Sequence, residues 1–351
     1  MSWQRIRGHD HWVRAFDQAV RRGRLAHAYL FVGPNGIGKG LFAGELAKAL
    51  LCEGVQSGKL EACDKCPACI LVNAGTHPDF FGVGRPWINK DGKEGNEFPI
   101  DIMRELCDRF ALKSARGKGK VAVLDDADDL NEESSNCFLK TLEEPPPRSV
   151  FILIATRPDL LRSTVVSRCQ MVRFAPLAEP VMVDLLLAHG QKDRAHVTRL
   201  ARLSGGSPGQ ALALADAELW KFRRLLLEGL TQPRPDAVAL AKAWNQFVEE
   251  AGKETAAQRR RAGLVLRLLI EFLNDALALA LGKSPKLADP DDLAFLQKLS
   301  QRLGSDHLLT LLDRCLEAEF HLDRYVPLVL VLEGLLDALG QELVRFGGEA
   351  K

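Results

Sequence analysis

Residues 33–40, GPNGIGKG, follow a short apolar run and precede a helical pattern. In that context G-x-x-x-x-G-K-[ST] is a P-loop, whose backbone N–H groups cradle phosphates while its Lys contacts the β/γ-phosphates. The predicted nucleotide-binding residues here are Gly33, Asn35, Gly36, Gly38, Lys39 and Gly40. Gly40 replaces the Ser or Thr whose hydroxyl binds Mg²⁺. The loop therefore predicts nucleotide binding without the usual metal ligand for hydrolysis.

The first half of the chain alternates apolar runs with helical patterns, which is typical of a parallel sheet flanked by helices. The predicted strands are residues 28–32, 79–83, 121–125, 150–155 and 171–174, and the predicted helices are residues 11–22, 39–51, 100–112, 132–141 and 159–165. Several of the strands are almost entirely apolar, as expected when both faces of a sheet are covered. Residues 85–99, rich in Gly, Pro and charge, predict a surface loop.

From Pro176 onward the pattern is helical, with a break at residues 204–209 and a predicted linker at 231–235. The periodicity predicts a small helical domain over 177–225 and a larger helical domain over 226–351, after an α/β domain over 1–176.

Composition limits the partners and the compartment. With 47 basic and 46 acidic residues, the formal charge of +1 gives no overall field that attracts nucleic acid. No apolar run reaches the roughly 18 residues of a membrane span, and residues 1–10 are too polar for a signal peptide. We expect a cytoplasmic protein with no membrane partner, in which disulfides are rare.

Four of the eight cysteines are closely spaced: Cys52, Cys63, Cys66 and Cys69. Two C-x₂-C spacings and a fourth thiol at a predicted helix end fit tetrahedral Zn²⁺. The alternative is a set of unrelated free thiols. We predict a closed, structural zinc site within an insertion at residues 52–69.

Two further patterns point to phosphate chemistry. An apolar strand ending in Asp125 and Asp126 is a Walker-B arrangement, in which Asp125 faces Mg²⁺ and Asp126 stands where the water-activating carboxylate, usually Glu, belongs. Asp126 is one methylene shorter, so its reach is doubtful. Arg168, in Ser-Arg-Cys before the last strand, is either a surface cation or an arginine finger for a neighbouring subunit's nucleotide.

Taken together, LAHAYLFVGP at 25–34, the four cysteines, LKTLEEPP at 139–146 and SRC at 167–169 resemble the bacterial clamp-loader family of AAA+ proteins. The resemblance covers about residues 5–215. It implies a P-loop AAA+ α/β domain with a five-stranded parallel sheet, a small helical lid domain and an all-α collar. The collar would join a hetero-pentamer with tau/gamma and delta subunits, which loads a sliding clamp onto primed DNA.

The family contains ATP-driven motor subunits and a rigid stator subunit. Gly40, the Asp125–Asp126 pair and residues 205–211, which lack the γ-phosphate-sensing Arg of motors, favour the stator. The resemblance then implies that Arg168 acts as a finger in trans and that ATP or ADP binds without hydrolysis. Thr156 matches a phosphate-sensing position, or is simply a Thr at a strand end.

Two alternatives remain open at this point: an active ATPase motor of the tau/gamma type, and a nucleotide-binding regulator unrelated to replication. The cluster Arg259, Arg260 and Arg261 either contacts DNA or forms a solvated helix face, and the second interpretation is favoured.

Overall fold

The computed structural model describes residues 2–55, 59–88, 94–95, 97–252, 254–285, 292–324 and 326–347. The chain divides into two compact units. The α/β unit comprises Met1–Val197 and Gly205–Gln210, and the helical unit comprises Thr198–Ser204 and Ala211–Lys351. The finer division at residues 176 and 225 stays a prediction.

A five-stranded parallel sheet forms the centre of the α/β unit, as predicted. Its spatial order is β2-β5-β6-β1-β7. The strands are β1 (Ala28–Val32), β2 (Phe80–Val83), β5 (Lys120–Leu124), β6 (Ser149–Ala155) and β7 (Gln170–Arg173). Because β1 lies between β6 and β7, the loop that follows it starts from an interior strand of the sheet and is flanked by strands on both sides.

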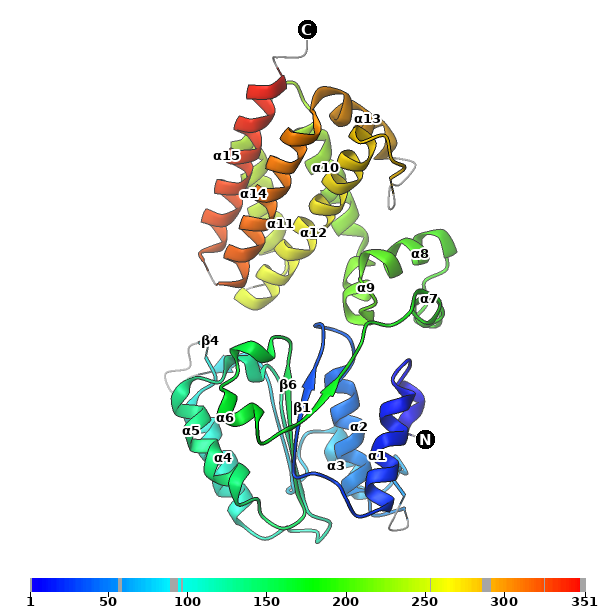
Figure 1. Ribbon diagram of the computed structural model, residues 1–351, viewed down its shortest axis with the longest axis vertical. Helices are drawn as coiled ribbons and strands as arrows, with labels where there is room; N and C mark the ends of the chain where they lie inside the picture. The colour runs from blue at the N-terminus through cyan, green and yellow to red at the C-terminus, as the bar shows by residue number, and fades with distance from the viewer. Residues whose placement is uncertain are drawn as a thin grey trace. The chain divides into compact units, whose positions relative to one another are not determined.

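Helices cover both faces of this sheet, with α1, α2 and α3 on one side and α4 and α5 on the other (Figure 1). The helices of the unit are η1 (Ser2–Arg5), α1 (Asp10–Arg21), α2 (Lys39–Leu51), α3 (Pro67–Asn73), α4 (Ile100–Ala111), η2 (Ala127–Asp129), α5 (Glu132–Glu143), η3 (Pro158–Leu160), α6 (Ser163–Val166) and α7 (Glu179–Ala188). Successive residues of a strand point to opposite faces. Leu30 accordingly joins the core beneath α4 and α5, while Phe31 packs against Phe42 and Phe174.

Two local predictions in this unit were wrong. The helix expected at 159–165 is interrupted, because Leu161 is extended and buried between η3 and α6. The segment 85–99 is not simply a surface loop: β3 (Trp87–Ile88) pairs with β4 (Glu94–Gly95). Trp87 and Phe98 are fully buried, with ring centroids 4.8 Å apart. The burial of these two aromatic rings outweighs the polar composition of the segment.

The described residues that follow β7 form helices and no strand, as predicted. Beyond α7 these are α8 (Arg194–Leu203), α9 (Pro208–Leu214), α10 (Ala217–Leu230), α11 (Ala237–Glu249), α12 (Thr255–Ala280), α13 (Leu293–Arg302), α14 (Ser305–Asp323) and α15 (Leu328–Gly347). In the helical unit α14 packs against α12 and α15, and α11 packs against α15. Among the described helices, none combines the length and the apolar character needed to cross a membrane.

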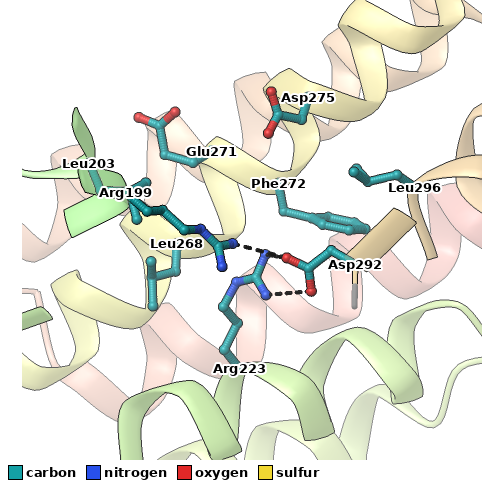
Figure 2. Close-up of a pocket in the computed structure, with 9 residues that line it drawn as sticks. All are labelled: Arg199, Leu203, Arg223, Leu268, Glu271, Phe272, Asp275, Asp292 and Leu296. Carbon is teal, nitrogen blue, oxygen red and sulfur yellow. Dashed lines mark hydrogen bonds and ion pairs between the residues drawn. The ribbon is translucent and has the colours of Figure 1, made fainter. Parts of the chain in front are cut away.

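A buried ion cluster connects three segments of the helical unit (Figure 2). Asp292, just before α13, accepts hydrogen bonds from Arg199 Nη2 at 3.0 Å and Arg223 Nη1 at 2.9 Å. The three side chains are 8–13% exposed. The Trp220 ring lies 4.5 Å from the Arg199 guanidinium carbon and 5.5 Å from that of Arg223. Burial would raise the pKa of Asp292, but the two arginines lower it, so the carboxylate stays charged.

Removing the shared carboxylate should be costly. Asp292→Ala leaves two buried guanidinium groups without their anion, so we expect a loss of about 3–5 kcal/mol in the free energy of unfolding of the helical unit. Urea unfolding followed by circular dichroism measures the loss. Lys221→Ala, which removes an exposed pair with Glu218, is the control and should leave the free energy of unfolding almost unchanged. Equal effects of the two substitutions would contradict the role of Asp292.

Candidate functional site

The P-loop leaves the carboxyl end of β1 and turns into α2 at Lys39. Gly38 precedes the helix with φ of 103°, a left-handed conformation that favours glycine. At Gly33 a Cβ would lie 2.5 Å from the carbonyl oxygen of Phe174, which leaves no room for a side chain. These two glycines are therefore required by the loop itself, whatever it binds.

The Lys39 ammonium is bound within the loop. Its Nζ donates to the carbonyl oxygens of Gly33 at 2.6 Å and Pro34 at 2.9 Å, and the side chain is buried. Burial lowers the pKa of Lys39, while the charge of Asp125 opposes that shift. To contact a phosphate, Lys39 would exchange these two carbonyl contacts.

Gly40 lies beside the first acidic residue. A Cβ at position 40 would stand 3.5 Å from Asp125 Oδ2, an ordinary van der Waals distance. In P-loop proteins these two positions contribute side-chain oxygens to Mg²⁺ binding. Here the fold brings them together, but only Asp125 has a side-chain oxygen. Nothing steric demands glycine at position 40.

Asp126, the candidate water-activating residue, is engaged by a neighbour that sequence reasoning missed. Burial, and then repulsion from Asp125 and Asp129, raise the pKa of Asp126 to about 6, while Arg85 opposes the shift. Arg85 Nε lies 3.9 Å from Asp126 Oδ2, and Arg85 Nη2 lies 2.6 Å from Asp129 Oδ2. Trp87 Nε1 also donates to Asp129, at 2.6 Å. The acidic segment is therefore partly neutralised within the chain.

Thr156 follows β6 and is exposed. Its backbone N–H donates to Asp128 Oδ2 at 2.8 Å, and the Arg157 N–H donates to Asp128 Oδ1 at 3.2 Å. Asp128 thereby fixes the end of β6 next to the P-loop strand.

A distant segment of the same unit contacts the P-loop directly. Ser207 Oγ donates to the Asn35 carbonyl at 2.8 Å, and the Gly209 N–H donates to the Gly36 carbonyl at 2.9 Å. His9 Nε2 lies 3.2 Å from the carbonyl of the next loop residue, Ile37. The chain itself thus holds three successive carbonyls of the loop, and residues 207–209 belong to the segment 205–211 singled out in the sequence.

The four cysteines converge, as their spacing predicted. Their sulfurs all lie within 4.8 Å of one another, with Cys52–Cys66 at 3.9 Å and Cys63–Cys69 at 4.0 Å. Metal–sulfur bonds of about 2.3 Å would place tetrahedral sulfurs about 3.8 Å apart. Burial raises the pKa of the Cys66 thiol, but backbone N–H groups of Cys69 and Glu53 and the neighbouring sulfurs outweigh it and bring the pKa to about 6. The cluster could hold a metal ion.

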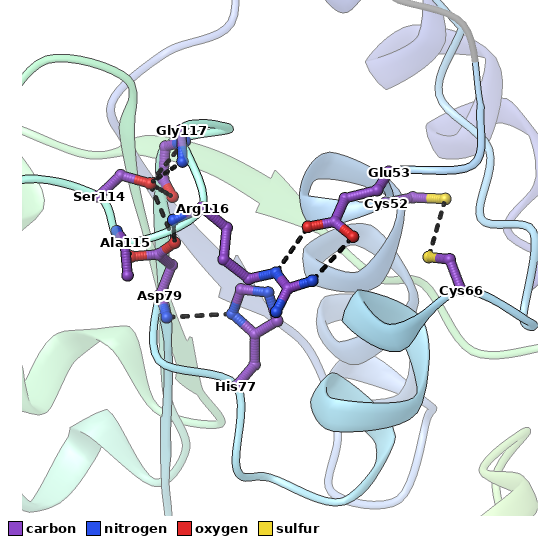
Figure 3. Close-up of polar contacts among 10 residues, drawn as sticks. Cys52, Glu53, Cys66, His77, Asp79, Ser114, Ala115, Arg116 and Gly117 are labelled. Atoms are coloured by element: carbon purple, nitrogen blue, oxygen red, sulfur yellow. Dashed lines mark hydrogen bonds and ion pairs between the residues drawn. The ribbon is translucent and has the colours of Figure 1, made fainter.

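The cluster is braced by polar contacts that the sequence did not reveal (Figure 3). Next to Cys52, Glu53 forms a two-pronged ion pair with Arg116, at 2.6 and 2.9 Å. Asp79 accepts from the backbone N–H groups of Ala115 and Arg116, which fixes the loop that carries this arginine. The His77 ring nitrogen Nδ1 in turn accepts from the Asp79 N–H at 3.0 Å.

Gly54 packs tightly against the cluster. A Cβ there would lie 2.7 Å from Cys63 Sγ. The position of Gly54 two residues after Cys52 is the sequence signal that could have assigned this glycine to the cysteine cluster.

Arg168 is held at the surface between α6 and β7. Its guanidinium contacts Glu143, the last residue of α5, at 2.6 Å, and the carbonyl oxygen of Thr164 at 2.9 Å. The pairing of Arg168 with Glu143 was not predicted.

Two members of the arginine cluster at 259–261 contact the helical unit itself. Arg259 donates to the carbonyls of Leu322 and Val326, at 3.1 and 2.7 Å. The Arg261 guanidinium lies 3.9 Å from the centroid of the Phe247 ring. The favoured interpretation, a solvated helix face, was therefore wrong for these two half-buried side chains and holds only for the exposed Arg260.

These features define a class. The parallel sheet of order β2-β5-β6-β1-β7, with a P-loop after β1 and an acidic pair after β5, is a P-loop α/β domain, the class of fold that the sequence predicted. Two family models match the chain: DNA polymerase III, delta subunit, at residues 8–178, and DNA polymerase III, delta subunit, C terminal, at residues 217–339.

Individual relatives agree with the family models. The chain is 32% identical over 270 residues to DNA polymerase III subunit delta′ of Escherichia coli, which covers 76% of this chain and 75% of that one. It is 36% identical over 241 residues to the delta′ subunit of Pseudomonas aeruginosa, covering 67% and 70%. The tau subunit of E. coli is 34% identical over 215 residues, 60% of this chain and 32% of tau. The chain belongs to the DNA polymerase III delta′ family.

Substitution of Gly209, with Gly44 as the control position, tests the contact between Gly36 and Gly209. A Cβ at Gly209 would lie 2.9 Å from Gly36 Cα, so Gly209→Ala should push residues 207–210 off the P-loop and cost about 1–3 kcal/mol. Gly44→Ala, inside α2 and with open space around it, should stabilise by up to about 1 kcal/mol. Chemical unfolding and hydrogen exchange of the loop amides measure both. Indistinguishable variants would show that the contact contributes nothing.

Proposed function

We propose that this chain is the stator subunit of the DNA polymerase III clamp loader, which places a sliding clamp on primed DNA. The observation that carries the proposal is the state of its own P-loop. The loop lacks a hydroxyl at Gly40, its carbonyls are held by Ser207 and Gly209, and Arg85 faces the acidic residue that would activate water. These features favour a subunit that assists the ATPase subunits of the complex over one that hydrolyses ATP itself.

In this proposal ATP or ADP binds without turnover. Gly33, Asn35, Gly36, Gly38, Lys39 and Gly40 form the cradle, with Asp125, Asp126 and Thr156 at the neighbouring strand ends. The glycine backbone of the cradle is present and the Lys39 Nζ lies within the loop, which supports binding. The missing oxygen at position 40 argues against hydrolysis.

Arg168 serves the nucleotide of an adjacent subunit. The parallel register pairs Tyr29 with Gln170 and Val32 with Arg173, so Arg168 precedes β7 at the amino edge of the sheet, whereas the P-loop leaves the carboxyl edge. At about 3.3 Å per residue, the paired strands separate Arg168 from its own loop by at least roughly 10 Å. An arginine at that edge can assist a phosphate only in trans.

The proposed partners are the tau/gamma and delta subunits of a hetero-pentamer, with clamp and DNA reached through the complex in the cytoplasm. One face of α14 carries Leu309, Leu316 and Phe320, each about half exposed. Their spacing of seven and four residues places them along one stripe of the helix. This stripe supports the helical unit as the collar that joins subunits.

The metal proposed for the cysteine cluster is a structural zinc ion, bound by Cys52, Cys63, Cys66 and Cys69. Four sulfur ligands leave no open position, so zinc would supply cross-linking of the 52–69 insertion and no chemistry.

Elemental analysis of the purified chain should find one zinc ion per chain. Cys69→Ser should lose it, because three sulfurs remain where four are needed. Cys137→Ser, a half-buried cysteine outside the cluster, should retain it and is the control. Chain purified under reducing conditions without zinc, or equal zinc content in the two variants, would contradict the assignment.

The functional test has two parts. The isolated chain should show no ATP turnover, because its Mg²⁺ site lacks an oxygen. In a complex reassembled with motor and delta subunits, Arg168→Ala should abolish the share of turnover from the motor site it faces, since an arginine finger contributes about 10³–10⁵ in rate. Arg162→Ala, an exposed arginine paired with Glu132, is the control.

Steady turnover by the isolated chain, lost in Lys39→Ala, would instead make the chain a motor of the tau/gamma type. An unchanged rate in the Arg168→Ala complex would exclude the finger.

A further inference from the structure

The contacts of Arg168 fix its guanidinium in one place. Nη2 lies 2.6 Å from Glu143 Oε1, and Nη1 donates to the Thr164 carbonyl at 2.9 Å and to Ser167 Oγ at 3.4 Å. A guanidinium has five N–H groups. The three contacts use three of them, so two remain for a phosphate.

The backbone beneath this side chain is also fixed. The Arg168 N–H donates to the Val165 carbonyl at 3.1 Å, and the Cys169 N–H donates to the Val166 carbonyl at 3.1 Å. Val165 is fully buried in the core under α4 and α5. The remaining freedom is therefore in the rotamers of Arg168, and Glu143 is the charged group that restricts them.

Stability does not explain the place of Glu143. It is the last residue of α5, where the helix dipole disfavours an anion. The two side chains are 35% and 52% exposed, and ion pairs at such exposure add little to folding stability. What the pair does provide is orientation, because the contact of Glu143 with Nη2 and that of the Thr164 carbonyl with Nη1 together hold the guanidinium at two of its nitrogens.

We infer that Glu143 is a positioning residue for Arg168: it holds the guanidinium ready for the phosphates of a nucleotide bound to the neighbouring subunit. The inference rests on the proposed function of Arg168 in trans. The weakness of an exposed pair also suits the role, because the carboxylate can yield when a phosphate arrives.

The test uses the reassembled complex and single-turnover ATP hydrolysis at the motor site that faces this chain. Glu143→Ala should lower the hydrolysis rate at saturating ATP roughly 3- to 10-fold, with little change in the ATP concentration at half-maximal rate, because the finger is present but less often oriented. Glu143→Gln keeps an oxygen acceptor and should lose less. Glu144→Ala, the exposed next residue, is the matched control and should behave like the unaltered chain.

A double substitution separates positioning from other effects. If Glu143 acts through Arg168, adding Glu143→Ala to Arg168→Ala should change nothing further. Additive losses, or a Glu143→Ala rate equal to or above that of the unaltered chain, would overturn the inference while leaving the finger intact. Full activity of the Arg168→Ala complex would instead contradict the proposed function of Arg168 in trans. Thermal melting of both single variants should match the unaltered chain.

Discussion

The parallel pairing of β1 with β7 is the constraint on which the arrangement of this molecule depends. Every strand of the sheet points the same way, so residues that follow strands and residues that precede them lie at opposite edges. The P-loop is at one edge and Arg168 at the other. A single domain can therefore carry its P-loop at one edge and Arg168 at the other, as the proposed role of Arg168 in trans requires. The edge with the P-loop has glycine at position 40 in place of Ser or Thr, and the opposite edge carries Arg168.

The modification of the edge with the P-loop consists of several small changes. Gly40 provides no side-chain oxygen, Ser207 and Gly209 hold the loop through its carbonyls, and Arg85 offsets the charges of Asp126 and Asp129. None of them disturbs the course of the backbone from β1 into α2. The result is a P-loop that the chain's own contacts hold as a structural part of the domain.

Sequence reasoning located features whose signal is local. The central strands β1, β5 and β6 are the clearest cases, because burial of every residue makes each an almost entirely apolar run. The cysteine cluster was found because its spacing is itself the signal. Pairs that meet only in the fold were missed. Ser207 reaches Asn35 across 172 positions and Glu143 reaches Arg168 across 25, and no local pattern encodes either partner. The segment 85–99 was misjudged because composition does not reveal that Trp87 and Phe98 are buried.

Helix α2 begins at the P-loop and ends at the cysteine cluster. Gly38, in a left-handed conformation, fixes the start, while Cys52 and the ion pair of Glu53 with Arg116 fix the end. At about 1.5 Å per residue, its 13 residues form a rod of about 20 Å. A rod clamped at both ends can neither slide nor rotate about its axis. The sulfur cluster at the carboxyl end of α2 therefore helps to fix the position of Gly40, at the other end, beside the Asp125 carboxylate.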